Sequence, residues 1–211
     1  MSPVAATGDA ESSGDTKARL TEAALETLKA KGFAGCSARE IAKAGNFNQA
    51  LVFYHFGSVH NLLLAALDLV SERRLRAYEE PFERAQTLAE LAALARQIYA
   101  EDLRNGYVTV LGEMVAGGVS DPELGAQVAA RMQPWIDMVE RKVRALLAGS
   151  LLESMVPPRD AAFAIIALYL GMDMLSHLDG DQSRAESLLD LGVRSAPLLG
   201  LLLPAERAVE E

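Results

Sequence analysis

Apolar and polar residues follow a helical period along most of the chain, and no stretch shows the two-residue period of a β-strand. Between residues 159 and 178, for example, Phe163, Ile166, Leu170 and Met174 lie on one helical face. This spacing predicts an all-α protein. We expect helices over residues 58–80, 87–103, 108–117, 122–148, 159–178 and 183–202.

Turn-forming residues separate these predicted helices. Asp121 and Pro122 combine a helix cap with a proline in the first turn, and Gly149 follows the longest helix. Pro81 marks the end of the predicted helix over residues 58–80. Residues 1–14 lack periodicity and are rich in Ala, Ser, Gly and Asp, so we expect a disordered arm there.

Two very short helices with a tight turn between them are predicted over residues 37–56. Ser37 and Glu40 have the spacing of a capping box, in which each side chain pairs with a backbone amide at the helix start. Gly45 and Asn46 then form the turn, because both residue types accept positive φ. Two short helices joined by such a turn form a helix-turn-helix, which predicts that the chain reads DNA.

The second short helix leaves polar, aromatic and small side chains outside, while Leu51, Val52 and Phe56 are predicted to pack in the core. Amide side chains suit base edges, an arginine on the preceding helix suits guanine or phosphate, and tyrosine and histidine suit the DNA backbone. We therefore expect DNA contacts from Ser37, Arg39, Asn48, Gln49, Ala50, Phe53, Tyr54 and His55.

Residues 17–67 resemble the DNA-binding domain of the TetR family of one-component bacterial repressors. The matching pattern consists of a leading helix with Leu20, Ala24 and Leu28, a bend over residues 31–33, and then residues 37–42 and 51–58. The aromatic residues and histidine over 53–56 are its most specific part. The resemblance implies that the ring of Phe53 or Tyr54 sets the recognition helix against the DNA backbone.

The chain departs from the family pattern at several positions. Gly45-Asn46 replaces the usual Ala-Gly pair of the turn, and Asn46 is expected to take the positive φ. Val59 stands where a lysine that contacts phosphate is common. His60 and Asn61 are also unusual for the family, and Asn61 leaves a cap by Ser58 without its reciprocal carboxylate.

The charge is distributed unevenly along the chain. The whole chain has a net charge of −9, yet residues 16–58 contain six Lys or Arg against three Glu. A basic head on an acidic body can orient the protein on a polyanion. The alternative is that these charges are simply solvated and have no functional consequence.

Composition favours a cytoplasmic protein. The only cysteine, Cys36, cannot form an intramolecular disulfide, and no export signal opens the chain. The longest uncharged apolar run, residues 161–172, is shorter than the roughly twenty residues that a membrane-spanning helix needs. We therefore expect no membrane partner.

The predicted helix over residues 159–178 is apolar on more than one face. Ile165, Leu168, Met172 and Leu175 cover a second side of the helix over 159–178, so this helix must bury two faces. One face can meet the domain's own core and the other a second subunit, which predicts a homodimer. The final helix would join through Leu188, Leu191 and Leu198, and the TetR resemblance implies the same pair of helices. A buried central helix of a monomer is the alternative.

Aromatic rings, thioethers and a few polar groups inside the C-terminal bundle are candidates for binding a small-molecule effector. These residues are Tyr107, Glu113, Met114, Trp135, Met138, Tyr169, Met172, Asp173 and His177. Asp173 and Glu113 are the more informative, because an unpaired carboxylate in an apolar stretch is costly. Each could instead reach solvent or pair with an arginine, and the Met and aromatic residues could be ordinary core.

The sequence offers little support for an enzyme. It contains no Gly-rich phosphate loop, nucleophile elbow or His-Glu-x-x-His pair, and its three histidines and one cysteine have no metal-ligand spacing. We expect no catalytic residue, no cofactor and no metal site. A helical protein-interaction or small-molecule carrier module that has lost specific DNA binding remains the competing class, favoured by Val59 alone.

These patterns together predict a ligand-responsive, sequence-specific transcriptional regulator. We expect a repressor released from a palindromic double-stranded DNA operator by a small apolar or amphipathic effector. The expected organisation is a disordered arm over residues 1–14, a three-helix helix-turn-helix domain over 15–62, an effector-binding and dimerisation bundle over 63–205, and a tail over 206–211.

Overall fold

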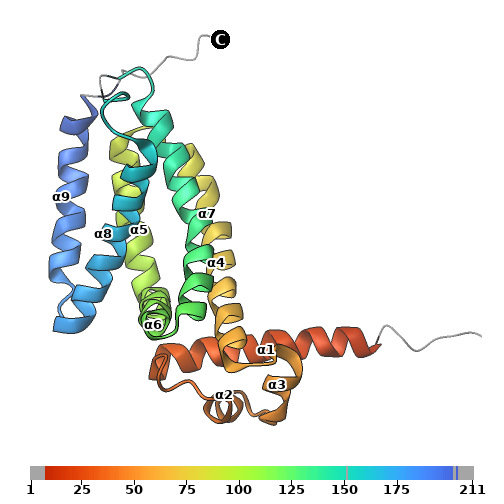
Figure 1. Cartoon of the computed structure of the whole chain (residues 1–211). Coiled ribbons are helices and arrows are strands. Elements are labelled where there is room, and N and C mark those ends of the chain that lie inside the picture. Colours follow the sequence, from red (N-terminus) through yellow and green to blue (C-terminus); the bar gives the residue numbers. More distant parts are fainter. Residues whose placement is uncertain (1–7, 151, 202, 204–211) are drawn as a thin grey trace, which may run out of the picture. The chain divides into compact units, whose positions relative to one another are not determined.

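The computed structural model describes residues 8–150, 152–201 and 203, and the secondary structure of this part of the chain is entirely helical (Figure 1). The prediction of an all-α protein is therefore confirmed. The helices are α1 Gly8–Lys31, α2 Ala38–Gly45, α3 Ala50–Phe56, α4 Val59–Arg84, α5 Leu88–Arg104, α6 Tyr107–Ser120, α7 Pro122–Leu147, α8 Pro158–Asp179 and α9 Ser183–Gly200.

Two ends differ from the sequence-based expectation. Helix α1 begins at Gly8, within the arm expected over residues 1–14. Residues 1–7 and the expected tail over 206–211 lie outside the described residues. Helix α4 continues past Pro81 to Arg84, because proline lacks the N–H donor but its carbonyl still accepts a hydrogen bond from the Ala85 N–H at 3.2 Å.

The chain divides into two compact units. The first unit comprises Met1–Arg73 with Thr109–Val128, and the second comprises Arg74–Val108 with Ala129–Glu211. The first unit thus extends beyond the boundary expected at residue 62 and includes most of α6 and the start of α7.

The core of the first unit is formed by the apolar faces of α1 to α4. Leu20 and Leu28 of α1, Ile41 of α2, Val52 of α3 and Leu62 of α4 are all fully buried. Because α2 and α3 have only eight and seven residues, neither is long enough to be stable alone. Their positions depend on this shared core.

The turn between α2 and α3 has a left-handed residue and a close packing contact. Asn46 adopts φ 56°, as the sequence predicted, and Phe47 N–H returns to the Ala42 carbonyl at 2.8 Å. Gly45 does not have positive φ. A Cβ atom there would instead overlap the Phe47 ring and lie 2.8 Å from the Ala23 Cβ. Gly45 is therefore required for close packing, while Asn46 supplies the left-handed conformation.

Helix α6 belongs to the first unit through contacts with the bend after α1. The Phe33 N–H donates to Oε2 of Glu113 at 2.7 Å, and Gly32 beside it has φ 68°. A Cβ atom at Gly117 would lie 2.8 Å from the Phe33 ring, so this ring packs directly on the α6 backbone. His60 Nδ1 and Asp121 Oδ2 form a further contact at 3.4 Å.

The second unit is held by packing of α5 and α8 with α9. Tyr99, Met172 and Ala185 form a buried cluster on these three helices, and Tyr169 and Leu189 pack against it. The Lys142 ammonium donates to the carbonyls of Glu83 at 3.1 Å and Ala85 at 2.8 Å. These two bonds satisfy carbonyl groups at the C-terminal end of α4, where the helix supplies no N–H partner.

Gly45→Ala should destabilise the first unit by about 1–3 kcal/mol, because the added methyl group overpacks the contact with Phe47. Gly14→Ala is the matched control, since a Cβ there meets nothing within 4 Å and alanine favours a helix. Urea unfolding followed by circular dichroism measures both changes. Equal stability of the two variants would contradict the packing role of Gly45.

Candidate functional site

The start of α2 is capped, but only one half of the predicted reciprocal arrangement is formed. The Ser37 hydroxyl accepts a hydrogen bond from the Glu40 N–H at 3.2 Å. The Glu40 carboxylate pairs with Lys31 instead of returning to Ser37, so the predicted capping box is wrong in this respect. The hydrogen bond and the charge of Lys31 lower the pKa of Glu40 below its usual value. The carboxylate therefore ties α2 to the end of α1.

The start of α3 uses the side chain of Asn48. Its Oδ1 accepts a hydrogen bond from the Ala50 N–H at 2.9 Å, as asparagine commonly does at a turn. Gln49 follows and makes no capping hydrogen bond with its side chain. The helix ends at Gly57, which has φ 74°. Asn48 and Gln49 are the two amides predicted to read bases, and Asn48 thus also has a structural role.

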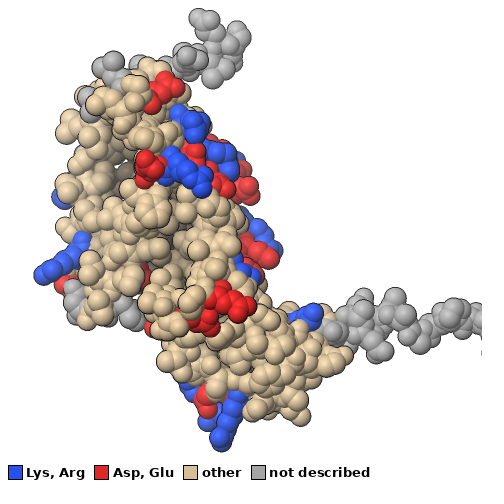
Figure 2. All heavy atoms as spheres, viewed as in Figure 1, with Lys and Arg blue, Asp and Glu red and all other residues tan. Residues whose placement is uncertain are grey.

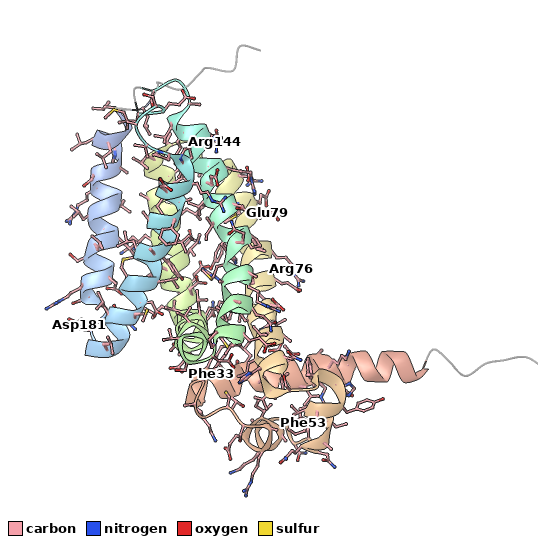
Figure 3. The ribbon with its side chains drawn as sticks, viewed as in Figure 1. Phe33, Phe53, Arg76, Glu79, Arg144 and Asp181 are labelled. Atoms are coloured by element: carbon pink, nitrogen blue, oxygen red, sulfur yellow. The ribbon has the colours of Figure 1, made fainter. Side chains whose placement is uncertain are left out.

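The expected DNA contacts gather on α2, α3 and the residues that precede each helix. Tyr54 is 80% exposed and Phe53 is 49% exposed, although both are large aromatic residues. Figure 3 labels Phe53 on α3. The Tyr54 and His55 rings meet edge to face, with centroids 4.8 Å apart. Most of the expected residues are exposed, with His55 half-buried: Ser37, Arg39, Asn48, Gln49, Ala50, Phe53, Tyr54 and His55. An exposed aromatic front on a helix that is anchored by buried Val52 is a surface suited to contact another molecule.

Two basic residues near this surface were not among the expected contacts. Lys43 lies exposed in the last turn of α2. Figure 2 shows Lys and Arg atoms beside acidic ones at the lower tip of the view, where Figure 1 places α2. The Arg19 guanidinium lies over the Phe47 ring, 5.0 Å from its centroid. The excess of basic residues over 16–58 was the available signal. The cation–π contact could not be anticipated because it joins α1 to the turn after α2.

Ser58 caps the start of α4, and Asn61 stands where a capping box would have a carboxylate. The Ser58 hydroxyl accepts a hydrogen bond from the Asn61 N–H at 3.1 Å. The Asn61 side-chain amide donates to the Phe56 carbonyl at 2.9 Å, so it links the end of α3 to the start of α4. An amide can make this bond and a carboxylate cannot, because only the amide has a donor.

Comparison with known proteins bears directly on this arrangement. Residues 20–66 match the family model for bacterial regulatory proteins of the tetR family. The chain carries a TetR-family domain. None of the curated proteins is a significant match.

Solved structures similar to the chain share the fold of the TetR-family domain and of the helices that follow it. One is a putative TetR-family transcriptional regulator from Rhodococcus sp., with TM-score 0.72 and 18% identity over 86% of this chain and 98% of that one. The regulator FadR from Bacillus subtilis, in complex with stearoyl-CoA, has TM-score 0.69 and 14% identity over 84% and 96%. Salmonella enterica GusR has TM-score 0.68 and 22% identity over 89% and 95%.

The candidate effector contacts divide between the two units. Glu113 and Met114 lie in the first unit with the TetR-family domain. The Glu113 carboxylate is engaged by the Phe33 N–H, and Met114 is fully buried. The candidates in the second unit are Tyr107, Trp135, Met138, Tyr169, Met172, Asp173 and His177. The His177 side chain lies outside the described residues.

The second unit contains a buried ion pair that joins candidate residues from separate helices. Arg74 Nε donates to Asp102 Oδ1 at 3.0 Å, and the Tyr169 hydroxyl donates to Asp102 Oδ2 at 2.7 Å. The guanidinium also lies over the Trp135 ring, 4.6 Å from its centroid. These four residues come from α4, α5, α8 and α7. Burial raises the pKa of the Asp102 carboxyl, and Arg74 and Tyr169 oppose that effect.

Tyr99 lies beside this ion pair and is almost completely buried. Its ring meets the Tyr169 ring edge to face at 5.7 Å. Its hydroxyl has no hydrogen-bond partner of good geometry in the described part of the chain, although Ser176 lies near it. Asp173, also on α8, is buried at 6% exposure. The structure thus brings Trp135, Tyr169, Met172 and Asp173 into one region of the second unit.

The Cys36 thiol is partly buried and lies near Glu113. Burial and the charge of Glu113 raise the pKa of Cys36 to about 11, so this thiol is protonated at neutral pH. Among the described residues, no three His, Cys, Asp or Glu side chains are placed to hold a metal ion. No single described helix is long and apolar enough to cross a membrane. Helices α3 and α4, which are bent by 69° relative to each other, reach the required length and apolar composition only when they are taken together.

Asp102→Ala should destabilise the second unit by about 3–5 kcal/mol, because it leaves the Arg74 guanidinium buried without its carboxylate. Arg74→Met combined with Asp102→Leu should lose less, since no charge is then buried. Glu80→Ala, which breaks an exposed pair with Arg84 on the same helix, should change stability little. Denaturant unfolding measures all three, and an Asp102→Ala protein as stable as the unchanged chain would contradict the role of the pair.

Proposed function

We propose that the chain is a sequence-specific DNA-binding transcriptional regulator that represses its target until a small molecule binds the second unit. The observation that carries the proposal is the exposed polar and aromatic front of α3, within a segment that matches the TetR family. The anchored helix would enter the major groove, as recognition helices of helix-turn-helix proteins do. Exposed Arg39 and Lys43 on α2 would contact phosphates.

The regulator would act as a homodimer through α8 and α9. Phe163, Leu168 and Leu175 on α8 are 64%, 53% and 65% exposed, and Leu198 on α9 is 70% exposed. An exposed apolar patch of this kind is typical of a protein interface. Two identical heads related by a two-fold axis would read a palindromic operator with half-sites about one helical turn or more apart.

Release from DNA would follow from a change in α4, which contributes to both units. Arg73 pairs with Glu22 of α1 in the first unit, and the next residue, Arg74, pairs with Asp102 of α5 in the second. A ligand that alters the surroundings of Arg74 would thus act next to Arg73, which pairs with Glu22 in the first unit. A preference of a few kcal/mol for one of two states would be enough to release the operator.

A small apolar or amphipathic effector is favoured by the side chains around Arg74 and Tyr169. Trp135 and Met172 supply apolar and polarisable surface, while the Tyr99 hydroxyl and the buried ion pair supply polar groups. Such a mixture is typical of small-molecule sites. These side chains would bind, and we assign no catalytic role to any of them.

A helical interaction or carrier module is the second candidate. The observation that favours it is Val59, which is half-buried at the start of α4 and supplies no cation for a phosphate. Such a module would bind DNA weakly or without a preferred sequence.

Gln49→Ala should relax base preference, whereas Tyr54→Phe should weaken binding to all sequences alike. The first change removes an amide that reads a base edge, and the second removes a hydroxyl expected to contact phosphate. Selection from a randomised duplex library, followed by affinity measurement at fixed salt, distinguishes the two effects. Enrichment of no motif by the unchanged protein would instead favour the interaction or carrier module.

Leu168→Glu with Leu175→Glu should convert the dimer to a monomer, because each subunit would bury two unpaired carboxylates at the interface. Val119→Glu is the control, since Val119 is 81% exposed on α6, away from α8 and α9 in the sequence. Sedimentation velocity measures the oligomeric state. A dimer that survives the α8 changes would place the interface elsewhere.

A further inference from the structure

The reading surface of α3 has an unusual composition. Between Lys43 and Arg73 the sequence contains no lysine or arginine. The exposed side chains at the start and front of α3 are two amides, a methyl group, a phenyl ring and a phenol, from Asn48, Gln49, Ala50, Phe53 and Tyr54. The helix therefore presents no guanidinium or ammonium group to a base.

This composition limits which base pairs α3 can recognise. In the major groove, guanine is read chiefly by Arg or Lys donating to O6 and N7. Adenine is read by the amide of Asn or Gln, which donates to N7 and accepts from N6. The thymine methyl is read by apolar contact with groups such as an alanine methyl or a phenyl ring. The side chains of α3 supply the second and third kinds of contact.

The structure also decides which of the two amides can read adenine. Asn48 already uses its Oδ1 to accept the Ala50 N–H at 2.9 Å, so that oxygen is committed to starting α3. Gln49 is exposed and makes no capping hydrogen bond with its side chain. Both polar atoms of Gln49 are thus placed to bind adenine together.

The apolar part of the surface is equally well placed. Phe53 is 49% exposed, and Ala50, one turn before it, is exposed as well. Residues three apart on a helix are neighbours, so these two side chains form one apolar patch beside Gln49. Val52 is buried on the opposite side and holds the helix in place. A patch of this kind matches the thymine methyl group.

The basic residues that could read guanine lie on a different element. Arg39 and Lys43 are on α2, and the first helix of a helix-turn-helix crosses the DNA backbone. Arginine and lysine there neutralise phosphates and carry little sequence information.

We propose that the operator positions contacted by α3 are A·T pairs, with Gln49 reading adenine and Phe53 and Ala50 packing on a thymine methyl. This inference rests on the proposed function, because it requires α3 to enter a major groove. It defines the chemistry of the partner: a half-site with an A·T centre under α3, flanked by phosphates that bind α2.

The test begins with selection from a randomised duplex library using the full-length protein at low and moderate salt. The expected result is a motif whose half-sites each contain adjacent A·T pairs. G·C pairs at those positions would overturn the inference and leave the proposed function intact. Absence of any motif would overturn the proposed function itself.

Modified bases in the selected duplex then test each contact. Replacing thymine by deoxyuridine removes only the C5-methyl group, and replacing adenine by 7-deazaadenine removes only the N7 acceptor. At the contacted position, 7-deazaadenine should weaken binding of the unchanged protein about 5- to 150-fold, the usual discrimination of a bidentate base contact. Deoxyuridine should weaken binding about 4-fold, the usual contribution of one buried methyl or methylene group. An A·T motif that tolerates both modified bases would overturn the assigned contacts, because the preference would then arise from DNA shape.

Matched protein variants complete the cycle. Phe53→Ala should bind the thymine duplex more weakly and lose its sensitivity to deoxyuridine, while it keeps its sensitivity to 7-deazaadenine. Gln49→Ala should lose its sensitivity to 7-deazaadenine, while it keeps its sensitivity to deoxyuridine. Both residues are exposed, so neither change removes a buried core contact. If both variants kept their full sensitivity to deoxyuridine and to 7-deazaadenine, the assignment of Phe53 to thymine and of Gln49 to adenine would be overturned.

Discussion

Helix α3 has seven residues, and its position depends on contacts with the neighbouring helices of the first unit. A helix this short has too few internal hydrogen bonds to be stable in water. Val52 anchors it in a core built with α1, α2 and α4, and the Phe47 ring packed on Gly45 sets the turn that precedes it. The exposed aromatic and amide front exists because this opposite side is buried. The proposed reading of DNA therefore depends first on packing.

The second unit has a different constraint, which is a buried charge. Asp102 is completely buried and is bound by Arg74 and Tyr169, while Trp135 covers the guanidinium. Removing two charges from water costs free energy that their attraction only partly returns. The pair joins α4 to α5, since each of these helices supplies one of the two charged partners.

Helix α4 relates these two features along the chain. Arg73 and Arg74 are consecutive, yet their carboxylate partners, Glu22 and Asp102, belong to different compact units. Adjacent residues on a helix point in directions about 100° apart, because there are 3.6 residues per turn. A single stretch of α4 can therefore be held by both units. Two consecutive residues of α4 thus make contacts within two different compact units.

The sequence by itself determined the helical class, the approximate limits of most helices and the helix-turn-helix, because these depend on local periodicity, caps and turn residues. Ser37 as a cap and Asn46 at positive φ are local features of this kind, and both are confirmed. The tertiary structure alone decided that Glu40 pairs with Lys31, that Gly45 makes room for Phe47, and that Arg74 meets Asp102. It also placed the Glu113 carboxylate on the Phe33 N–H, 80 residues away. Such contacts depend on which surfaces fold together, and no local pattern of charge or hydrophobicity specifies that choice.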